Sequence, residues 1–183
     1  MAYRRLFLLV EGEDDARFFK HVVIPLLLRD RDYQQVEPIQ FRAWSKEKLK
    51  KFLHSIEAMG AEYLLVGDLD LHPCVTAAKE VVARRHPFVE PARVQIVKAE
   101  IESWYCAGIP DRDPELGSLK IATCSDTSEV TKEAFYASLG PKAPFRIPFL
   151  VSLLERFDLE TAVRRNASFR YFVRKYLNLP AGA

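Results

Sequence analysis

The chain has 183 residues, of which 49% are hydrophobic and 28% charged, so its composition is that of an ordinary globular protein. The 7 glycines and 11 prolines exclude a low-complexity class, and the length favours one domain with a small addition. No apolar run reaches the roughly 18 residues of a membrane span, and the run from Leu6 to Val10 is too short for the core of a signal peptide. We therefore expect a soluble, cytoplasmic protein.

The cysteines indicate neither a disulfide framework nor a zinc site. Cys74, Cys106 and Cys124 are an odd number without a secretion signal, so we expect reduced thiols. No CxxC or HxxxH spacing supports zinc binding.

Strand and helix patterns alternate over about the first hundred residues. Four apolar segments have the composition of buried strands, and each is followed by helical spacing. The predicted strands are residues 5–11, 36–44, 63–70 and 92–98. Pro38 makes the second of them an edge or irregular strand. The alternation predicts a doubly wound α/β domain with a mostly parallel sheet of about four strands.

The helices of this domain have recognisable starts and stops. The segment 13–27 has an acidic first turn and apolar residues at helical spacing, and we expect Pro25 to kink or end this helix. Ser45 is placed to cap the next helix and Gly60 to end it. A third helix begins near Pro73.

The C-terminal part has a different character. Residues 107–128 are polar and interrupted by proline and glycine, which predicts a loop or lid. The chain is then helical, with one helix opened by Pro148 and a final amphipathic helix over 169–177. We expect an α/β domain over 1–128 and a helical cap over 129–183 packed on it.

Carboxylates follow three of the four predicted strands. Glu11 ends the first strand, Asp68 and Asp70 end the third, and Glu100 and Glu102 follow the fourth. Because the carboxyl ends of parallel strands share one edge of a sheet, these acids gather there if the strands are neighbours. Such a cluster repels itself unless a cation neutralises it, and Mg²⁺ prefers oxygen ligands.

Each acid also has a structural alternative. Glu13 and Asp14 suit the start of a helix, where the dipole favours negative charge. Asp68 and Asp70 are also common turn residues, although Gly67 before them permits a close approach of the backbone. Glu102, taken alone, is an ordinary solvated helix position.

Two of these segments resemble the motifs of the toprim domain. LLVEGEDDARFF (8–19) is similar to its first motif and matches it at Glu11, Gly12 and Asp15. LLVGDLD (64–70) is similar to its second motif, a strand followed by Asp-x-Asp.

Two later segments carry a narrower resemblance. KAEIESWYCAG (98–108), with Glu102, resembles a stretch in stand-alone bacterial toprim-like proteins of uncharacterised function. Those proteins look akin to the toprim nuclease part of overcoming-lysogenization-defect enzymes. The segment with Pro141, Lys142 and Ser168 resembles the helical tail of the same family.

The resemblance implies a toprim-like, Rossmann-like fold and chemistry on a phosphodiester that depends on Mg²⁺ or Mn²⁺. By this resemblance Glu11 is a general acid/base, and Asp68 and Asp70 are metal ligands. Asp15 and Glu102 are additional ligands in a two-metal nuclease. A nuclease on DNA or RNA, with a role in defence against mobile elements, is the implied function.

Other functions stay open from the sequence. The chain has no GxxxxGK[ST] P-loop and no primase-type zinc motif, and nothing supports topoisomerase tyrosine chemistry. A non-catalytic module on the same fold would bind nucleic acid or a partner protein. A phosphatase or nucleotidyl transferase would use the same metal site on small phosphorylated molecules.

Basic residues provide candidates for nucleic-acid contacts. Residues 142–183 carry 8 Lys and Arg against 3 Asp and Glu, so this region is positive while the net charge of the whole chain is only +2. Lys98 either neutralises a phosphate or pairs with the acids. The tail candidates, which are otherwise a solvated helix surface, are Arg164, Arg165, Arg170, Arg174 and Lys175.

Overall fold

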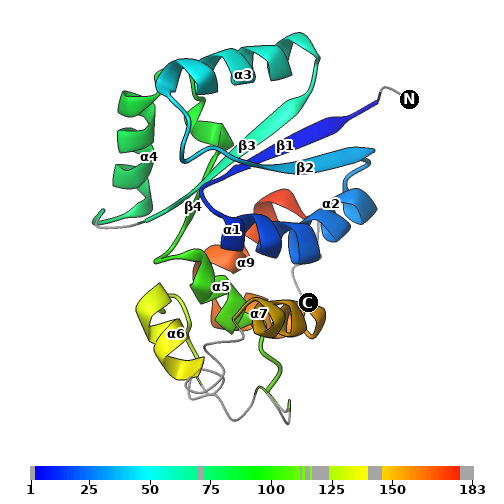
Figure 1. The fold of residues 1–183 in the computed structure, drawn as a ribbon, viewed down its shortest axis with the longest axis vertical. Coiled ribbons are helices and arrows are strands. Elements are labelled where there is room, and N and C mark those ends of the chain that lie inside the picture. Colours follow the sequence, from blue (N-terminus) through cyan, green and yellow to red (C-terminus); the bar gives the residue numbers. More distant parts are fainter. Residues whose placement is uncertain are drawn as a thin grey trace. The chain divides into compact units, whose positions relative to one another are not determined.

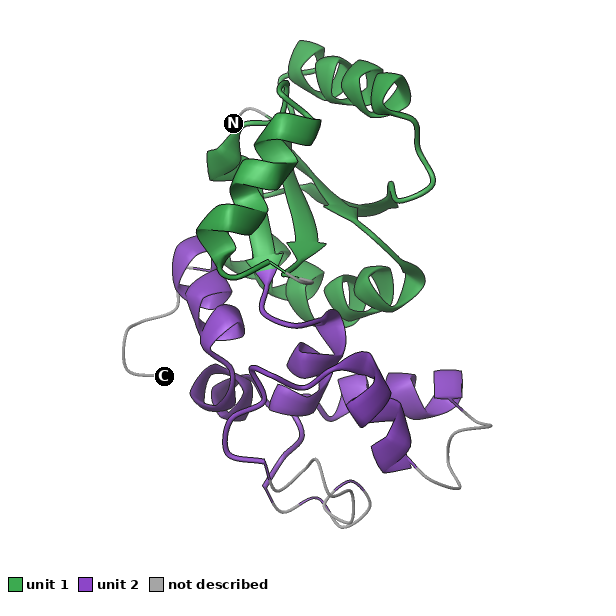
Figure 2. Cartoon of the chain, turned by 90° about the vertical axis from the view of Figure 1, so that its left-hand side faces the viewer, with its two compact units in different colours: residues 1–96 green, residues 97–183 purple. Residues whose placement is uncertain are grey.

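The computed structural model describes residues 3–69, 72–111, 113, 116, 124–139 and 146–177. The chain divides into two compact units, Met1–Ile96 and Val97–Ala183, which Figure 2 shows in different colours. The boundary that composition suggested at residue 128 lies inside the second unit.

The first unit is built on a four-stranded parallel sheet. Its strands are β1 (Arg5–Val10), β2 (Gln35–Gln40), β3 (Glu62–Asp68) and β4 (Val94–Val97), in the spatial order β2-β1-β3-β4. β1 pairs in parallel with both β2 and β3. The α/β fold and the four strands are therefore confirmed, and Pro38 lies on an edge strand as predicted.

Helices flank this sheet. In Figure 1, α1 (Glu13–Phe18) and α2 (Ile24–Asp30) lie on one side of it, and α3 (Lys46–Ala58) and α4 (Val75–Arg85) lie on the other. A short 3-10 turn, Pro91–Arg93, precedes β4. The core on the α3 and α4 side joins alternate strand residues to the apolar faces of the helices, which include Leu9, Leu49, Leu53, Ile56, Leu65, Ala78 and Ile96.

Of the two effects expected at Pro25, a kink or an end of the helix, the structure rules out the end. Pro25 is the second residue of α2, and a π-helical stretch, Phe19–Val23, joins α1 to α2. Within it the Ile24 N–H donates to the carbonyl of Phe19, five residues back. A proline near the start of a helix costs no hydrogen bond that the helix needs, so the chain continues to Asp30.

The predicted ends of α3 are confirmed. The Oγ atom of Ser45 accepts a hydrogen bond from the Lys48 N–H at 3.2 Å, which satisfies one donor at the start of the helix. Gly60 adopts φ +63° after the last turn, and its N–H donates to the Glu57 carbonyl at 2.9 Å. The loop that follows leads directly into β3.

The second unit is helical in its described parts, as the C-terminal pattern predicts. Buried aromatic side chains, among them Trp104, Phe169 and Phe172, form its interior. In the part of the chain that the structure describes, no helix combines the length and apolar character needed to cross a membrane. The helices are α5 (Ile101–Ala107), α6 (Lys132–Leu139), α7 (Arg146–Glu155), α8 (Leu159–Arg165) and α9 (Ala167–Tyr176).

Replacement of Gly60 by alanine is expected to lower the free energy of unfolding by about 1–2 kcal/mol, because a Cβ atom is strained at positive φ. A Cβ atom there would meet no other atom within 4 Å, so the cost comes from the backbone alone. Urea unfolding measures it. Gly60→Asn should cost less, because asparagine tolerates this conformation, and equal losses in the two variants would contradict the explanation.

Candidate functional site

The direction of the chain through the sheet reverses between β1 and β3. From β1 the chain moves outward to β2, whereas from β3 it moves outward to β4 on the other side. In open parallel sheets, a crevice forms beyond the carboxyl ends of the two strands where the order reverses. The residues that immediately follow β1 and end β3 are therefore placed at the natural binding position of this fold.

Glu11 directly follows β1 and lies against the end of β3. A Cβ atom at position 67 would be 3.2 Å from Oε1 of Glu11, closer than almost all Cβ contacts in proteins. Glycine at this position therefore allows the carboxylate to approach the β3 backbone. As the sequence indicates, Gly67 permits a close approach of the backbone, and the Glu11 carboxylate is the group that lies close to it.

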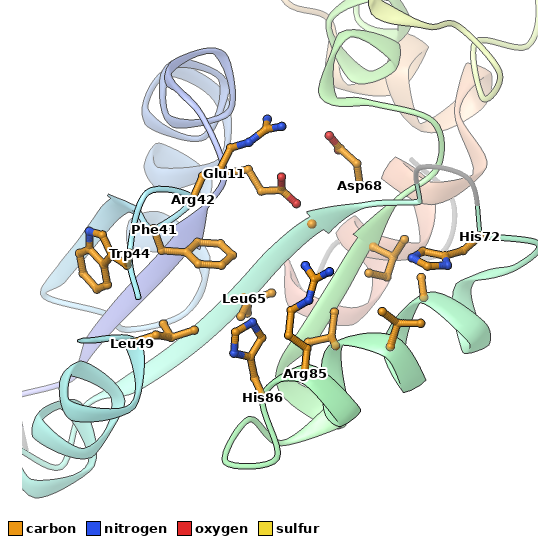
Figure 3. A pocket seen from close by; sticks show the side chains of 15 residues that line it. Glu11, Phe41, Arg42, Trp44, Leu49, Leu65, Asp68, His72, Arg85 and His86 are labelled. Carbon is orange, nitrogen blue, oxygen red and sulfur yellow. The ribbon is translucent and has the colours of Figure 1, made fainter. Parts of the chain in front are cut away.

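Asp68, the last residue of β3, lines the same cavity as Glu11. Figure 3 shows the two carboxylates at the same end of this cavity, on the two adjacent strands. Asp68 is partly buried, and its Oδ1 atom is inaccessible to solvent. Asp70, the other acid of the Asp-x-Asp motif, lies outside the described residues.

Asp15 organises the start of α1. Its Oδ2 atom accepts a hydrogen bond from the Gly12 N–H at 3.1 Å, and the side chain is 7% exposed. Asp14 forms an ion pair with Arg17 one turn along the same helix. The acidic helix start thus holds the turn that follows Glu11 in place.

The cavity has a volume of about 430 Å³ and also contains cationic and imidazole side chains. Arg42 comes from the loop between β2 and α3, and Arg85 is the last residue of α4. His72 and His86 flank α4 at its two ends. Figure 3 shows Arg85 reaching into the middle of the cavity.

Sequence reasoning did not assign Arg42 or Arg85 to the site. Arg85 at the end of a helix suggests only a favourable interaction with the helix dipole. No local signal shows that α4 turns this residue toward the acids at the ends of β1 and β3. His72, two residues after Asp70 in the sequence, also lines the cavity.

His86 is held in its neutral form. Burial lowers its pKa, and the nearby charges of Arg85 and Lys46 lower it further. Its ring packs edge-on against Phe88, with ring centroids 5.7 Å apart. Among the described residues its Nδ1 atom has no hydrogen-bond partner. At neutral pH this side chain therefore adds no positive charge to the cavity.

Glu102 belongs to the second unit, where it is 2% exposed on α5. Its Oε1 atom accepts a hydrogen bond from the Tyr136 hydroxyl at 3.4 Å and lies 3.4 Å from Nζ of Lys132. The neighbouring Glu100 accepts a hydrogen bond from the Lys132 N–H at 2.6 Å. These carboxylates thus hold α6 against α5 within their own unit.

Lys98 and Trp104 also lie in the second unit. Nζ of Lys98 forms an ion pair with Glu129 at 2.5 Å, an acid outside the group that follows the predicted strands. Trp104 is fully buried, and its indole N–H donates to Ser168 Oγ at 2.8 Å.

The basic tail residues differ in their surroundings. Arg164 and Arg165 both pair with Asp111, and Arg165 is buried and donates to the Ile109 carbonyl at 2.9 Å. The other three lie on or beside α9: Arg170 donates to backbone carbonyls, Arg174 is exposed, and Lys175 lies over the rings of Tyr171 and Tyr176.

The carboxylates at the ends of β1 and β3 fit the needs of Mg²⁺. Among the described residues, no group of three or more His, Cys, Asp or Glu side chains is arranged to hold a metal ion. Mg²⁺ commonly takes only one or two carboxylates from a protein and completes its shell with water and phosphate. Glu11 and Asp68 supply that number at one end of one cavity.

Comparison with known proteins gives one structural match. No protein-family model matches the chain, and no curated protein matches it either. Among solved structures, the chain is similar to the C-terminal region of the Burkholderia pseudomallei OLD protein, with 12% sequence identity and a TM-score of 0.48. The match covers 97% of this chain and 100% of that one.

If Glu11 holds a divalent ion, Gly67→Ala is expected to weaken Mn²⁺ binding about tenfold, or about 1.4 kcal/mol, because the added Cβ requires the Glu11 carboxylate to shift by a few tenths of an ångström. The contact is with the end of a flexible side chain, so the fold should be retained. Calorimetry with Mn²⁺ measures the affinity, and Glu13→Gln, an exposed acid outside the cavity, is the control. Unchanged affinity in Gly67→Ala would contradict the role given to this close approach in metal binding.

His86 is expected to make the stability depend on pH below about pH 6.5, its ordinary pKa. Since its pKa is lower in the folded chain, protonation favours the unfolded chain. Its contribution to the free energy of unfolding is complete above pH 6.5 and declines as the pH falls toward the lowered pKa. Urea unfolding across this range should show a weaker decline in His86→Gln, and an unchanged one in the exposed-histidine variant His54→Gln.

Proposed function

We propose that the chain is a toprim-type phosphodiester hydrolase that acts on DNA or RNA and depends on Mg²⁺ or Mn²⁺. The observation that carries the proposal is that Glu11 and Asp68, from adjacent parallel strands, line one cavity. These two acids belong to the two segments whose sequences resemble the toprim motifs. A role in defence against mobile elements and a cytoplasmic location are parts of the proposal that the resemblance and composition support.

The residues of this site have distinct proposed roles. Glu11 accepts a proton from the attacking water or returns one to the leaving oxygen, and its position against Gly67 keeps the carboxylate at the cavity. Asp68, Asp70 and Glu11 hold the ion. The chemistry that a bound Mg²⁺ supplies is neutralisation of charge on the phosphate and the leaving oxygen. Arg42 and Arg85 add positive charge at the same cavity.

Asp15 and Glu102 remain candidate ligands of a second ion. Asp15 already caps α1 through Oδ2, and Glu102 already contacts Lys132 and Tyr136. Metal binding would therefore require each carboxylate to share or exchange its present partner. Nucleic-acid contacts by Lys98 and the five basic tail residues are likewise proposed, and exposed Arg174 has the most accessible charge of those on α9.

The proposal is tested by incubating the purified chain with single- and double-stranded DNA and RNA in Mg²⁺, in Mn²⁺ and in EDTA. We expect cleavage that requires the ion and falls at least about 10²-fold in Glu11→Gln and in Asp68→Asn, because each substitution removes a charge from the reacting centre. Glu13→Gln should cleave like the wild type.

The outcomes separate the proposal from its main alternative. Cleavage that persists in both acid variants would place the reaction elsewhere or in a contaminant. Nucleic-acid binding without cleavage in either metal would replace the hydrolase with a non-catalytic binding module. Thermal unfolding of each variant establishes that a lost activity is not a lost fold.

A further inference from the structure

The cavity beside Glu11 and Asp68 is chemically divided in a way that the hydrolysis reaction alone does not require. One end holds the two acids with Arg42 beside Glu11, and Arg85 lies farther along the cavity, near His86 (Figure 3). Apart from His72 and His86, the remaining wall is apolar and continues over β3 between α3 and α4. Its residues are Phe41, Trp44, Leu49, Leu65, Ala78, Val81, Val82 and Ile96.

The two arginines are available for an anion. Among the described residues, neither Arg42 nor Arg85 has an ion-pair partner, whereas Arg4, Arg17 and Arg93 each pair with an acid. Both are exposed, and they reach the cavity from different elements. Guanidinium groups match the geometry of phosphate oxygens better than other side chains do.

Phe41 gives the apolar wall a flat surface next to these charges. Its N–H donates to the Val10 carbonyl at 3.0 Å, and its carbonyl accepts from the Trp44 N–H at 2.8 Å, so the backbone fixes its position. Figure 3 shows the ring of Phe41 facing the cavity. Trp44 is already packed against the ring of Phe52 and lies under Nζ of Lys48, so it serves as a wall.

The size of the cavity limits what can enter it. A volume of about 430 Å³ lies within the range of about 300–1,000 Å³ that is typical of small-molecule sites. One nucleotide has a phosphate and a flat base, and its size suits a cavity of this volume. A base within a duplex is stacked and paired, so it must first be extruded at a cost of a few kcal/mol.

We propose that this cavity binds a single unpaired nucleotide, with its phosphate between Arg42 and Arg85 and its base against Phe41. The inference rests on the proposed function and names its substrate class: single-stranded nucleic acid or an unpaired end. Stacking on an aromatic ring is tolerant of sequence, so base identity has little effect on binding.

The direct test is calorimetric titration with adenosine monophosphate, inorganic phosphate and adenosine in the presence of Mg²⁺. Adenosine monophosphate contains no phosphodiester, so its binding is measured without cleavage. We expect it to bind at least tenfold more tightly than inorganic phosphate or adenosine. Arg42→Gln and Arg85→Gln should each weaken it about tenfold, while Arg84→Gln, the exposed neighbour outside the cavity, should not.

A second variant separates the base from the phosphate. Phe41→Leu keeps an apolar side chain but removes the aromatic face, so it should weaken adenosine monophosphate about fivefold and leave inorganic phosphate unchanged. Equal affinity for adenosine monophosphate and inorganic phosphate in the wild type would overturn the inference, as would an unaltered affinity in both arginine variants.

The failure of this inference is distinct from the failure of the proposed function. Cleavage that depends on Glu11 and Asp68, with equal rates on single strands and duplexes and no binding of adenosine monophosphate, overturns the nucleotide subsite alone. Binding of adenosine monophosphate that depends on Arg42 and Arg85, without cleavage of any nucleic acid, supports the subsite while the hydrolase proposal fails.

Discussion

The contact between the Glu11 carboxylate and the backbone at Gly67 is the constraint on which the site depends. It joins the residue after β1 to the end of β3 at the position where the chain reverses its direction through the sheet. A Cβ atom at position 67 would require the Glu11 carboxylate to shift by a few tenths of an ångström. The parallel pairing of β1 and β3 fixes this proximity, and Asp68 enters the same cavity as a consequence.

Charge balance in the cavity follows from elements that lie outside the two strands. The acids come from strand ends, whereas Arg42 comes from the loop after the edge strand β2, and Arg85 from the last turn of α4. Opposite charges that face one cavity lower the cost of gathering the acids. The cavity thus contains both kinds of group that a metal-bound phosphate requires. Carboxylates can bind the cation, and guanidinium groups can donate hydrogen bonds to the phosphate.

Several features could be predicted because local chemistry decides them. Ser45 begins α3 because its side chain can cap the helix, and Gly60 ends it because glycine tolerates a positive φ. Pro38 lies on an edge strand because it has no N–H to donate to a neighbouring strand. Helical structure does not end at Pro25, because a proline is tolerated when a new helical segment begins beside it, and the π-helical stretch before it supplies that start. Glu102 and Arg165 were identified as candidates by residue type, but their present partners depend on α6 and on Asp111.

The sequence by itself determined, to within two residues, where β1, β3 and β4 end and that carboxylates lie at or soon after these ends, because apolar runs and strand breaks are local properties of the chain. Only the tertiary structure decided that β1 and β3 are neighbours and that Glu11 rests on Gly67. It alone also brought Arg42, Arg85 and Phe41 to the cavity. These contacts between residues far apart in the sequence depend on how distant segments pack over a shared core. The spacing of residues along one segment does not specify them.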